Sequence, residues 1–397
     1  MQTSGSRRQR SARIAGIALL LAPPLLIVWN LAVLPIDPSL GIRIGRQLAG
    51  VIETPPPVRL SWSSLTKGSL QELAGIAVAE AYPLRPLLIR INHEIRFTLF
   101  GYISVPSLFQ GDHGQLVGMA DLAEYCSRGT DPSPEVRARE AIPKLKDIQA
   151  YYRARNRSFF YLISPSKPAY MPEKFVHRTS CPSTLEERTR LVPTFARLLR
   201  QAGIDVIDTA TLIHGLRGRY NLDLFPAGGG HWNMLGAAHA AELVVEETNR
   251  KRSRARLPKF SYSYEVVNRL TGTDSEFIDV MNIMFPHLVY PTAKVTFVPA
   301  VNCAGHEATR LRVAVVGSSF MHSLARGLIE AACLWQLSVY FYFNHGRYGG
   351  LSYGLLDPKY QDSASVLDAE IVILEENETS IGRSGHVDRF HSFIMSQ

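Results

Sequence analysis

The chain has few cysteines, and it lacks the short motifs that mark a metal or nucleotide site. Its four cysteines, Cys126, Cys181, Cys303 and Cys333, form no CxxC pair and no other spacing typical of zinc ligands. There is also no GxGxxG fingerprint and no phosphate-binding loop between a strand and a helix. We therefore expect neither a metal nor any other cofactor.

The chain also lacks a strong excess of charge of one sign. Charged residues make up 20% of the 397 residues, and the net charge of +8 is mild for this length. One basic cluster, at 250–256, could face phosphate or an anionic polymer, but we favour a solvated helix end. The sequence has no repeat, no low-complexity tract and no nucleic-acid-binding module, so nucleic acid is not an expected partner. An apolar content of 46% predicts a globular protein with a sizeable core.

The amino terminus carries the one long apolar run. Arg7, Arg8, Arg10 and Arg13 precede an uncharged stretch at 14–36. As a helix, this stretch would measure roughly 34 Å, enough to cross a bilayer. The arginines place its amino end in the cytoplasm, so we predict a single-pass anchor in the bacterial inner membrane with the remainder in the periplasm. A cleavable signal peptide is the alternative that the basic start also fits.

Export would permit disulfides. One or two are expected in that case, and the sequence does not choose among the three full pairings. Cys333 falls in a predicted apolar helix, and we expect it to be a buried free thiol.

The rest of the chain divides by pattern into a linker and one large domain. Residues 37–80 are rich in proline, serine and glycine and are predicted to be the linker, followed by a domain at 81–397. An edge hairpin is expected at 105–117. Residues 255–308 show no clean period and are predicted to be an irregular insertion.

From about residue 133, helical and strand patterns alternate. Helices are predicted at 134–155, 185–202, 233–249 and 320–333, and strands at 159–163, 206–207, 312–316, 338–343 and 371–374. Such alternation predicts a three-layer α/β domain, with a parallel sheet covered by helices on both faces.

The strand at 312–316 ends in a sharp turn that opens a helix. Gly317 permits the turn, and Ser318 and Ser319 stand at the helix start. A serine hydroxyl there lies where α/β sheets bind ligands and where a helix N-terminus favours negative charge. Ser319 is therefore a candidate nucleophile, although many serines in this position only cap helices.

A serine nucleophile needs a base, and histidine is the usual one. His231 stands in a glycine-rich turn, Gly228–Asn233, directly before the helix predicted at 233–249. It is the candidate base, although a lone histidine beside a tryptophan is more often a packed residue.

These motifs, in this order, resemble the AlgJ/AlgX type of alginate O-acetylation proteins, which carry an SGNH-hydrolase-like domain in the periplasm. The resemblance covers roughly residues 80–380. Its pieces lie at 82–85, 121–126, 164–170, 206–208, 231–233 and 316–320. Ordinary SGNH hydrolases place the serine before the histidine, so the reversed order here favours this family.

The resemblance implies O-acetyl transfer to an exported polysaccharide. Ser319 would attack an acetyl donor, His231 would take its proton, and the acetyl-enzyme would pass the group to a sugar hydroxyl. A membrane-bound O-acyltransferase would supply the acetyl group. The alternatives are an SGNH-type carbohydrate esterase and a catalytically impaired subunit that binds or assembles polysaccharide.

Several further residues are candidates for the site. The resemblance maps Gly317 to the oxyanion hole, and Asn377 follows a predicted strand end where it could be a second donor. Trp232 could stack on a sugar, His322 would lie one helical turn after Ser319, and Arg312 could meet a polymer carboxylate. Core packing explains Trp232 at least as well, a surface helix position explains His322 better, and strand-end solvation explains Arg312 equally well.

One expected residue is missing. The family's acid that orients the histidine corresponds to position 229, which is glycine here. In a serine protease, such a loss lowers the rate about 10⁴-fold, because the histidine takes the wrong tautomer. Asp223, Asp208 and Glu375 are the candidates to replace it. The site could also work as a Ser–His dyad, or have lost its chemistry.

Overall fold

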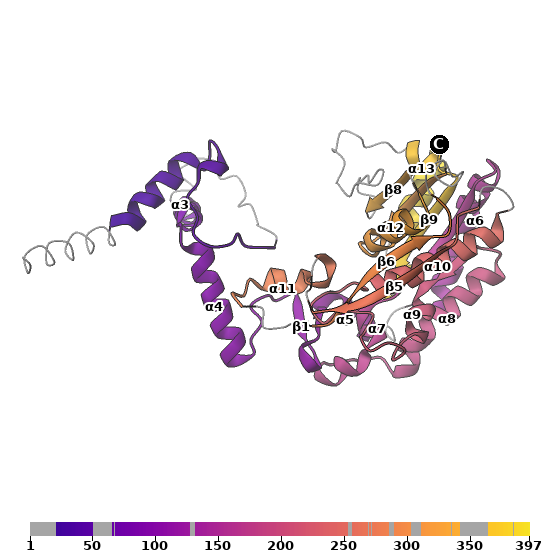
Figure 1. The fold of residues 1–397 in the computed structure, drawn as a ribbon, viewed down its shortest axis with the longest axis horizontal. Helices are drawn as coiled ribbons and strands as arrows, with labels where there is room; N and C mark the ends of the chain where they lie inside the picture. The colour runs from indigo at the N-terminus through magenta and orange to yellow at the C-terminus, as the bar shows by residue number, and fades with distance from the viewer. Residues whose placement is uncertain are drawn as a thin grey trace, which may run out of the picture. The chain divides into compact units, whose positions relative to one another are not determined.

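The computed structural model describes residues 21–50, 66, 68–127, 132–252, 256–268, 270, 272–285, 290–302, 311–334, 336–341, 364–383 and 385–397. The chain forms two compact units (Figure 1). The first comprises residues 1–105 with 278–286, and the second comprises 106–277 with 287–397. The catalytic candidates all belong to the second unit.

The regular elements described in the first unit are helices. Residues 21–33 form a helix, followed by α3 (Ser69–Ala81) and α4 (Arg85–Phe100). The buried side chain of Asn30 ties the first helix to the chain before α4, because its amide donates to the carbonyls of Ile42 and Ala81, at 2.8 Å each. No helix among the described residues has the length and apolar character needed to span a membrane. Part of the predicted anchor, residues 14–20, lies outside them.

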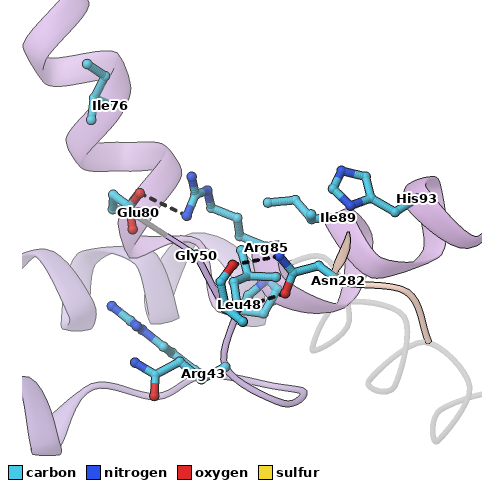
Figure 2. A pocket seen from close by; sticks show the side chains of 12 residues that line it. Arg43, Leu48, Gly50, Ile76, Glu80, Arg85, Ile89, His93 and Asn282 are labelled. Carbon is cyan, nitrogen blue, oxygen red and sulfur yellow. Dashed lines mark hydrogen bonds and ion pairs between the residues drawn. The ribbon is translucent and has the colours of Figure 1, made fainter. Parts of the chain in front are cut away.

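The first unit contains a cavity of about 640 Å³ (Figure 2). Arg85 and Glu80 form an ion pair at 2.9 Å on its wall. The amide of Asn282 exchanges two hydrogen bonds of 2.9 Å with the backbone of Ala49. Charged and apolar side chains both line the cavity, among them Arg43, Leu48, Ile76, Ile89 and His93. None of the predicted site residues does.

The second unit is built on five parallel strands in the order β4–β3–β9–β7–β8. The strands are β3 (Ser158–Ser164), β4 (Val206–Asp208), β7 (Arg312–Gly317), β8 (Gln336–Phe341) and β9 (Ile371–Asn377). The last strand in the chain, β9, lies in the centre, because its buried residues pair with β3 on one side and β7 on the other. The predicted α/β fold with a parallel sheet is confirmed.

Helices cover both faces of this sheet. Alternate residues of β3 point to opposite faces, so that Phe159 and Tyr161 belong to one core, and Phe160 and Leu162 to the other. Helices α6 (Pro134–Arg153), α8 (Leu185–Gln201) and α14 (His386–Met395) contribute to the first core. Helices α10 (Met234–Lys251) and α12 (Phe320–Ala331) contribute to the second. Two such layers around a sheet give the three-layer architecture.

The predicted insertion is more regular than its sequence indicates. Strands β5 (Phe260–Val267) and β6 (Thr292–Pro299) form an antiparallel hairpin, and β6 packs against α10 and α12. The short helix α11 (Glu276–Met281) lies between them in sequence.

The segment before the parallel sheet contains a second hairpin. Strand β1 (Leu108–Gln110) pairs with β2 (Leu116–Gly118) around a turn that includes Asp112–Gly114. They form a sheet of their own.

The three described cysteines are oxidised. Cys126 and Cys181 form a disulfide that closes a loop of 55 residues. The prediction that Cys333 is a free thiol is wrong, because this residue is also disulfide-bonded and no described cysteine is free. The predicted helix ends at Ala331, so Cys333 lies in the loop after it, where its thiol can reach a partner.

Candidate active site

The structure brings the predicted serine and histidine together. Ser319 follows the carboxyl end of β7 and immediately precedes α12. His231 lies in the turn before α10, whose first turn is capped by the side chain of Asn233. The Ser319 Oγ lies 2.5 Å from the His231 Nε2. A hydroxyl and an imidazole that are 88 residues apart in sequence therefore share a hydrogen bond at the rim of the sheet.

The acid beside the histidine is Glu276, which the sequence did not single out. Its Oε1 lies 2.7 Å from the His231 Nδ1 and also accepts the backbone N–H of Gly230 at 2.7 Å. A carboxylate on Nδ1 keeps the proton there, so Nε2 is free to accept the hydroxyl proton of Ser319. The three side chains form the hydrogen-bonded line Ser319–His231–Glu276.

The glycine at position 229 has a structural explanation. A Cβ on Gly229 would lie 2.2 Å from the carbonyl oxygen of Thr273 and 3.2 Å from the Cα of Asp274. Real Cβ atoms do not approach backbone so closely, so no side chain fits at this position. The loop that leads into Glu276 occupies that space. The loop that supplies Glu276 therefore takes the space that an acid at position 229 would need.

The acids named from the sequence have other partners. Asp208 caps α9 (Thr209–Gly215), because its Oδ1 accepts the backbone N–H of Thr211 at 2.9 Å. Asp223 contributes its backbone carbonyl, which accepts from the amide of Asn233 at 2.9 Å. Neither carboxylate takes the place of Glu276 on Nδ1.

Glu375 lies beneath the nucleophile turn. Its Oε2 accepts the backbone N–H of Ser318 at 2.5 Å, and its Oε1 accepts the Ser318 hydroxyl at 2.9 Å. Burial raises the pKa of this carboxyl, and the hydrogen bonds from Ser164 and Ser318 oppose that change. Gly317 is glycine for the same reason, since a Cβ there would lie 2.4 Å from Oε2 of Glu375. Glu375 therefore fixes the turn that presents Ser319.

A cavity of about 450 Å³ lies over the serine and histidine. Carboxylates stand on its wall, and its lining includes Asp121, Glu124, Lys167, Glu276, Phe277, Asn377 and His386. Burial, with a smaller contribution from the charge of Glu124, raises the pKa of Asp121 to about 6. The cavity is large enough for a small acyl group together with part of a sugar.

Asn377 lines this cavity, but its amide is engaged. Its Nδ2 donates to the carbonyl of Pro165 at 2.7 Å and to the hydroxyl of Ser164 at 3.2 Å. Both amide protons therefore hold the loop after β3 in place rather than point at an acyl oxygen.

The predicted sugar contacts lie elsewhere. Trp232 is fully buried, its indole N–H donates to the Ser323 hydroxyl at 2.7 Å, and its ring packs edge-on against Phe320. Arg312 begins β7, so it lies about 17 Å from the serine end of that strand, and it pairs with Glu370 at 3.0 Å.

His322 lies near the pair, one helical turn after Ser319. Burial lowers its pKa, and the neighbouring His231 lowers it further.

Comparison with known families identifies the domain. Residues 125–326, about half of the chain, match the family described as the SGNH hydrolase-like domain of acetyltransferase AlgX. The chain belongs to this AlgX family. The family predicted from the sequence is confirmed, and with it an SGNH-like acetyltransferase domain. His231, Glu276 and Ser319 all fall inside the matched residues. No curated protein sequence matches the chain.

The solved structures that are similar to this chain include the following three. The O-acetyltransferase domain of Pseudomonas putida AlgJ is 18% identical, with 74% of this chain and 99% of that chain covered and a TM-score of 0.47. Pseudomonas aeruginosa AlgX is 14% identical, with 72% and 68% covered and a TM-score of 0.46. Bacillus cereus PatB1 is 10% identical, with 69% and 96% covered and a TM-score of 0.41.

Proposed function

We propose that this AlgX-family chain transfers acetyl groups to hydroxyls of an exported bacterial polysaccharide through a serine acyl-enzyme. The observation that carries the proposal is the line Ser319–His231–Glu276, with contacts of 2.5 and 2.7 Å. Nucleophile, base and orienting acid are the three parts that serine acyl transfer requires.

In the first half-reaction, Ser319 Oγ attacks the carbonyl carbon of the acetyl donor while His231 Nε2 takes the hydroxyl proton. Glu276 stabilises the imidazolium that forms. The bond from the acetyl carbon to the donor then breaks, and His231 returns the proton to the leaving group. The product is acetyl-Ser319.

The developing oxyanion would be held by the N-terminus of α12. The backbone N–H of Ser319 lies at that helix start, where the helix dipole favours negative charge. Each well-placed donor is worth roughly 3 kcal/mol in such sites. Glu375, by holding Ser318, keeps the turn rigid.

In the second half-reaction, a sugar hydroxyl gives its proton to His231 and attacks the acetyl carbon. The ester bond to Ser319 breaks, and the proton returns to Oγ. Asp121 and Glu124 line the cavity where the acceptor would lie, and carboxylates accept hydrogen bonds from hydroxyls. Water in place of the sugar would make the same chain an esterase.

The proposal includes a location. The apolar run at 14–36 would anchor the chain in the inner membrane, with the domain in the periplasm and the acetyl group supplied by a membrane-bound O-acyltransferase. The disulfide between Cys126 and Cys181 supports an oxidising compartment.

The test uses the full chain, purified in detergent, with an activated acetyl ester as donor and a hydroxyl-rich oligosaccharide as acceptor. We expect the wild type to carry an acetyl group on Ser319 by mass spectrometry and to acetylate the oligosaccharide. Ser319→Ala should do neither. Acetyl release to water alone, at saturating acceptor, would favour the esterase. Equal background activity in wild type and Ser319→Ala would favour a binding subunit.

A further inference from the structure

Lys167 is a buried cation beside the candidate active site, and the proposed mechanism does not use it. It begins the short helix α7 (Lys167–Tyr170) after β3, and only 1% of its surface is exposed. Its Nζ donates to three backbone carbonyls, those of Pro226 at 2.7 Å, Ala227 at 3.0 Å and Gly229 at 2.8 Å. A lysine is rarely buried so completely without a carboxylate in direct contact.

The three carbonyls belong to the turn that carries the base. Gly229 is two residues before His231, and the next residue, Gly230, donates its N–H to Glu276. This turn has no regular secondary structure of its own. Lys167 binds carbonyls of this turn, and Glu276 accepts the N–H of Gly230. The loop at Thr273 packs against Gly229. A loss of either contact would let His231 move relative to Ser319.

Three accepting carbonyls require three N–H donors, and only the charged ammonium has three. Burial lowers the pKa of Lys167 well below the ordinary lysine value, and the charges of Glu276 and Asp223 oppose that change. Asp121 and Glu124 add negative charge to the cavity wall that Lys167 also lines. The negative groups around it thus favour the form that can make all three hydrogen bonds.

We propose that Lys167 is a positioning residue for acyl transfer, whose ammonium clamps the turn at 226–229 and so fixes the imidazole of His231 between Ser319 and Glu276. This inference rests on the proposed function. It assigns to Lys167 an effect on the rate of the chemical steps rather than on the binding of donor or acceptor.

The experiment compares Lys167→Met and Lys167→Ala in the full chain, with the exposed Lys146→Met as the matched control. We expect kcat for acetyl transfer to fall at least tenfold in both variants, with KM for the acceptor within about twofold of wild type. Lys146→Met should leave both unchanged. Propylamine added to Lys167→Ala should enter the cavity, occupy the vacated ammonium position and restore part of kcat in a saturable way.

The pH profile separates positioning from bulk stability. The activity of Lys167→Ala with propylamine should follow the protonated amine and decline as the amine loses its proton. If Lys167→Met does not fold, Lys167→Ala with and without propylamine decides alone. A wild-type kcat in a folded Lys167 variant would overturn the proposal. So would an amine that restores thermal stability without restoring kcat.

Ser319→Ala in the same assay keeps the two proposals apart. If Ser319→Ala retains full activity, the serine mechanism fails, whatever the Lys167 variants do. If Ser319→Ala is inactive and the Lys167 variants are unaffected, only the clamp fails.

Discussion

Glu276 and His231 are 45 residues apart in sequence, and the carboxylate of one lies 2.7 Å from the Nδ1 of the other. The acid therefore comes from the insertion between β5 and β6, not from the histidine turn. Because the loop before Glu276 fills the space at Gly229, the acid could not also stand at that position. The chemistry requires a carboxylate on Nδ1. Here that carboxylate comes from the insertion instead of the histidine turn.

Glu276→Gln should lower kcat by on the order of 10³- to 10⁴-fold while the protein stays folded. The amide can place an N–H against Nδ1, so the ring would take the tautomer with its proton on Nε2 and could not accept from Ser319. The measurement is steady-state acetyl transfer beside a thermal melt. Asp208→Asn is the control and should leave kcat near wild type, because the amide oxygen can still cap α9. A large loss of kcat in Asp208→Asn with none in Glu276→Gln would show that Glu276 is not the acid.

Restoring the family's acid at position 229 should not rescue Glu276→Ala. In the double variant Gly229→Asp/Glu276→Ala, the new Cβ would still meet the carbonyl of Thr273, which is backbone and cannot swing aside. We expect lower stability and no regain of kcat.

Gly215→Ala is the matched control for that variant, because a Cβ at Gly215 meets nothing within 4 Å and the position is helical. It should be neutral or stabilising by about 0.5–1 kcal/mol. Recovery of activity in the double variant would show that the loop before Glu276 moves easily, contrary to our interpretation of Gly229.

The sequence was sufficient for the sheet and for the Ser–His pair, because those depend on local patterns. A short β-branched run, a glycine and a serine predict β7 and its turn, and parallel strands bring their carboxyl ends to one edge. The same reasoning could not find Glu276. It stands in a stretch without a regular hydrophobic pattern, at the start of a six-residue helix. No local feature of the sequence shows which acid of an insertion will reach the histidine.

Trp232 shows a second limit of sequence patterns. Its place beside His231 made it a candidate for sugar stacking, but adjacent residues in a turn can point in opposite directions. The structure turns His231 to the cavity and Trp232 into the core. Burial of a single residue at the rim of a sheet depends on packing with distant elements, here α12, which a local pattern does not contain.

Trp232→Phe should therefore change stability and not acceptor binding. The substitution removes the indole hydrogen bond to Ser323 and part of a fully buried ring, at a cost of about 1–3 kcal/mol in the free energy of unfolding. KM for an acceptor oligosaccharide should stay within about twofold of wild type. A tenfold rise in KM with unchanged stability would instead restore Trp232 as a sugar contact.

Removal of the disulfide between Cys126 and Cys181 should destabilise the second unit. Closing a loop of 55 residues lowers the entropy of the unfolded chain, and the expected effect is about 4 kcal/mol at most. The variant Cys126→Ala/Cys181→Ala should unfold at lower denaturant concentration and keep its kcat well below that midpoint. Because neither cysteine lines the cavity at Ser319, a fall in kcat without loss of stability would contradict this prediction.

Asp274 provides a test of how the Glu276 loop responds to pH. Its Oδ2 accepts the hydroxyl of Thr292 at 2.6 Å, and burial raises its pKa to about 6, from an ordinary value of 3.8. The folded state thus holds this proton more tightly than the unfolded state does. Its contribution to stability is complete below about pH 4 and is lost as the pH rises through about 6.

Asp274→Asn should therefore be more stable than wild type above about pH 6, and this advantage should vanish below about pH 4, where Asp274 is protonated in both states. The amide oxygen can still accept from Thr292, so the contact itself is kept. Urea unfolding of both proteins across this pH range measures the difference, with the exposed Glu140→Gln as a control that should show no such crossover. A difference that is constant from pH 4 to 7 would mean that Asp274 titrates normally, and that the loop before Glu276 is open to solvent rather than packed against Gly229.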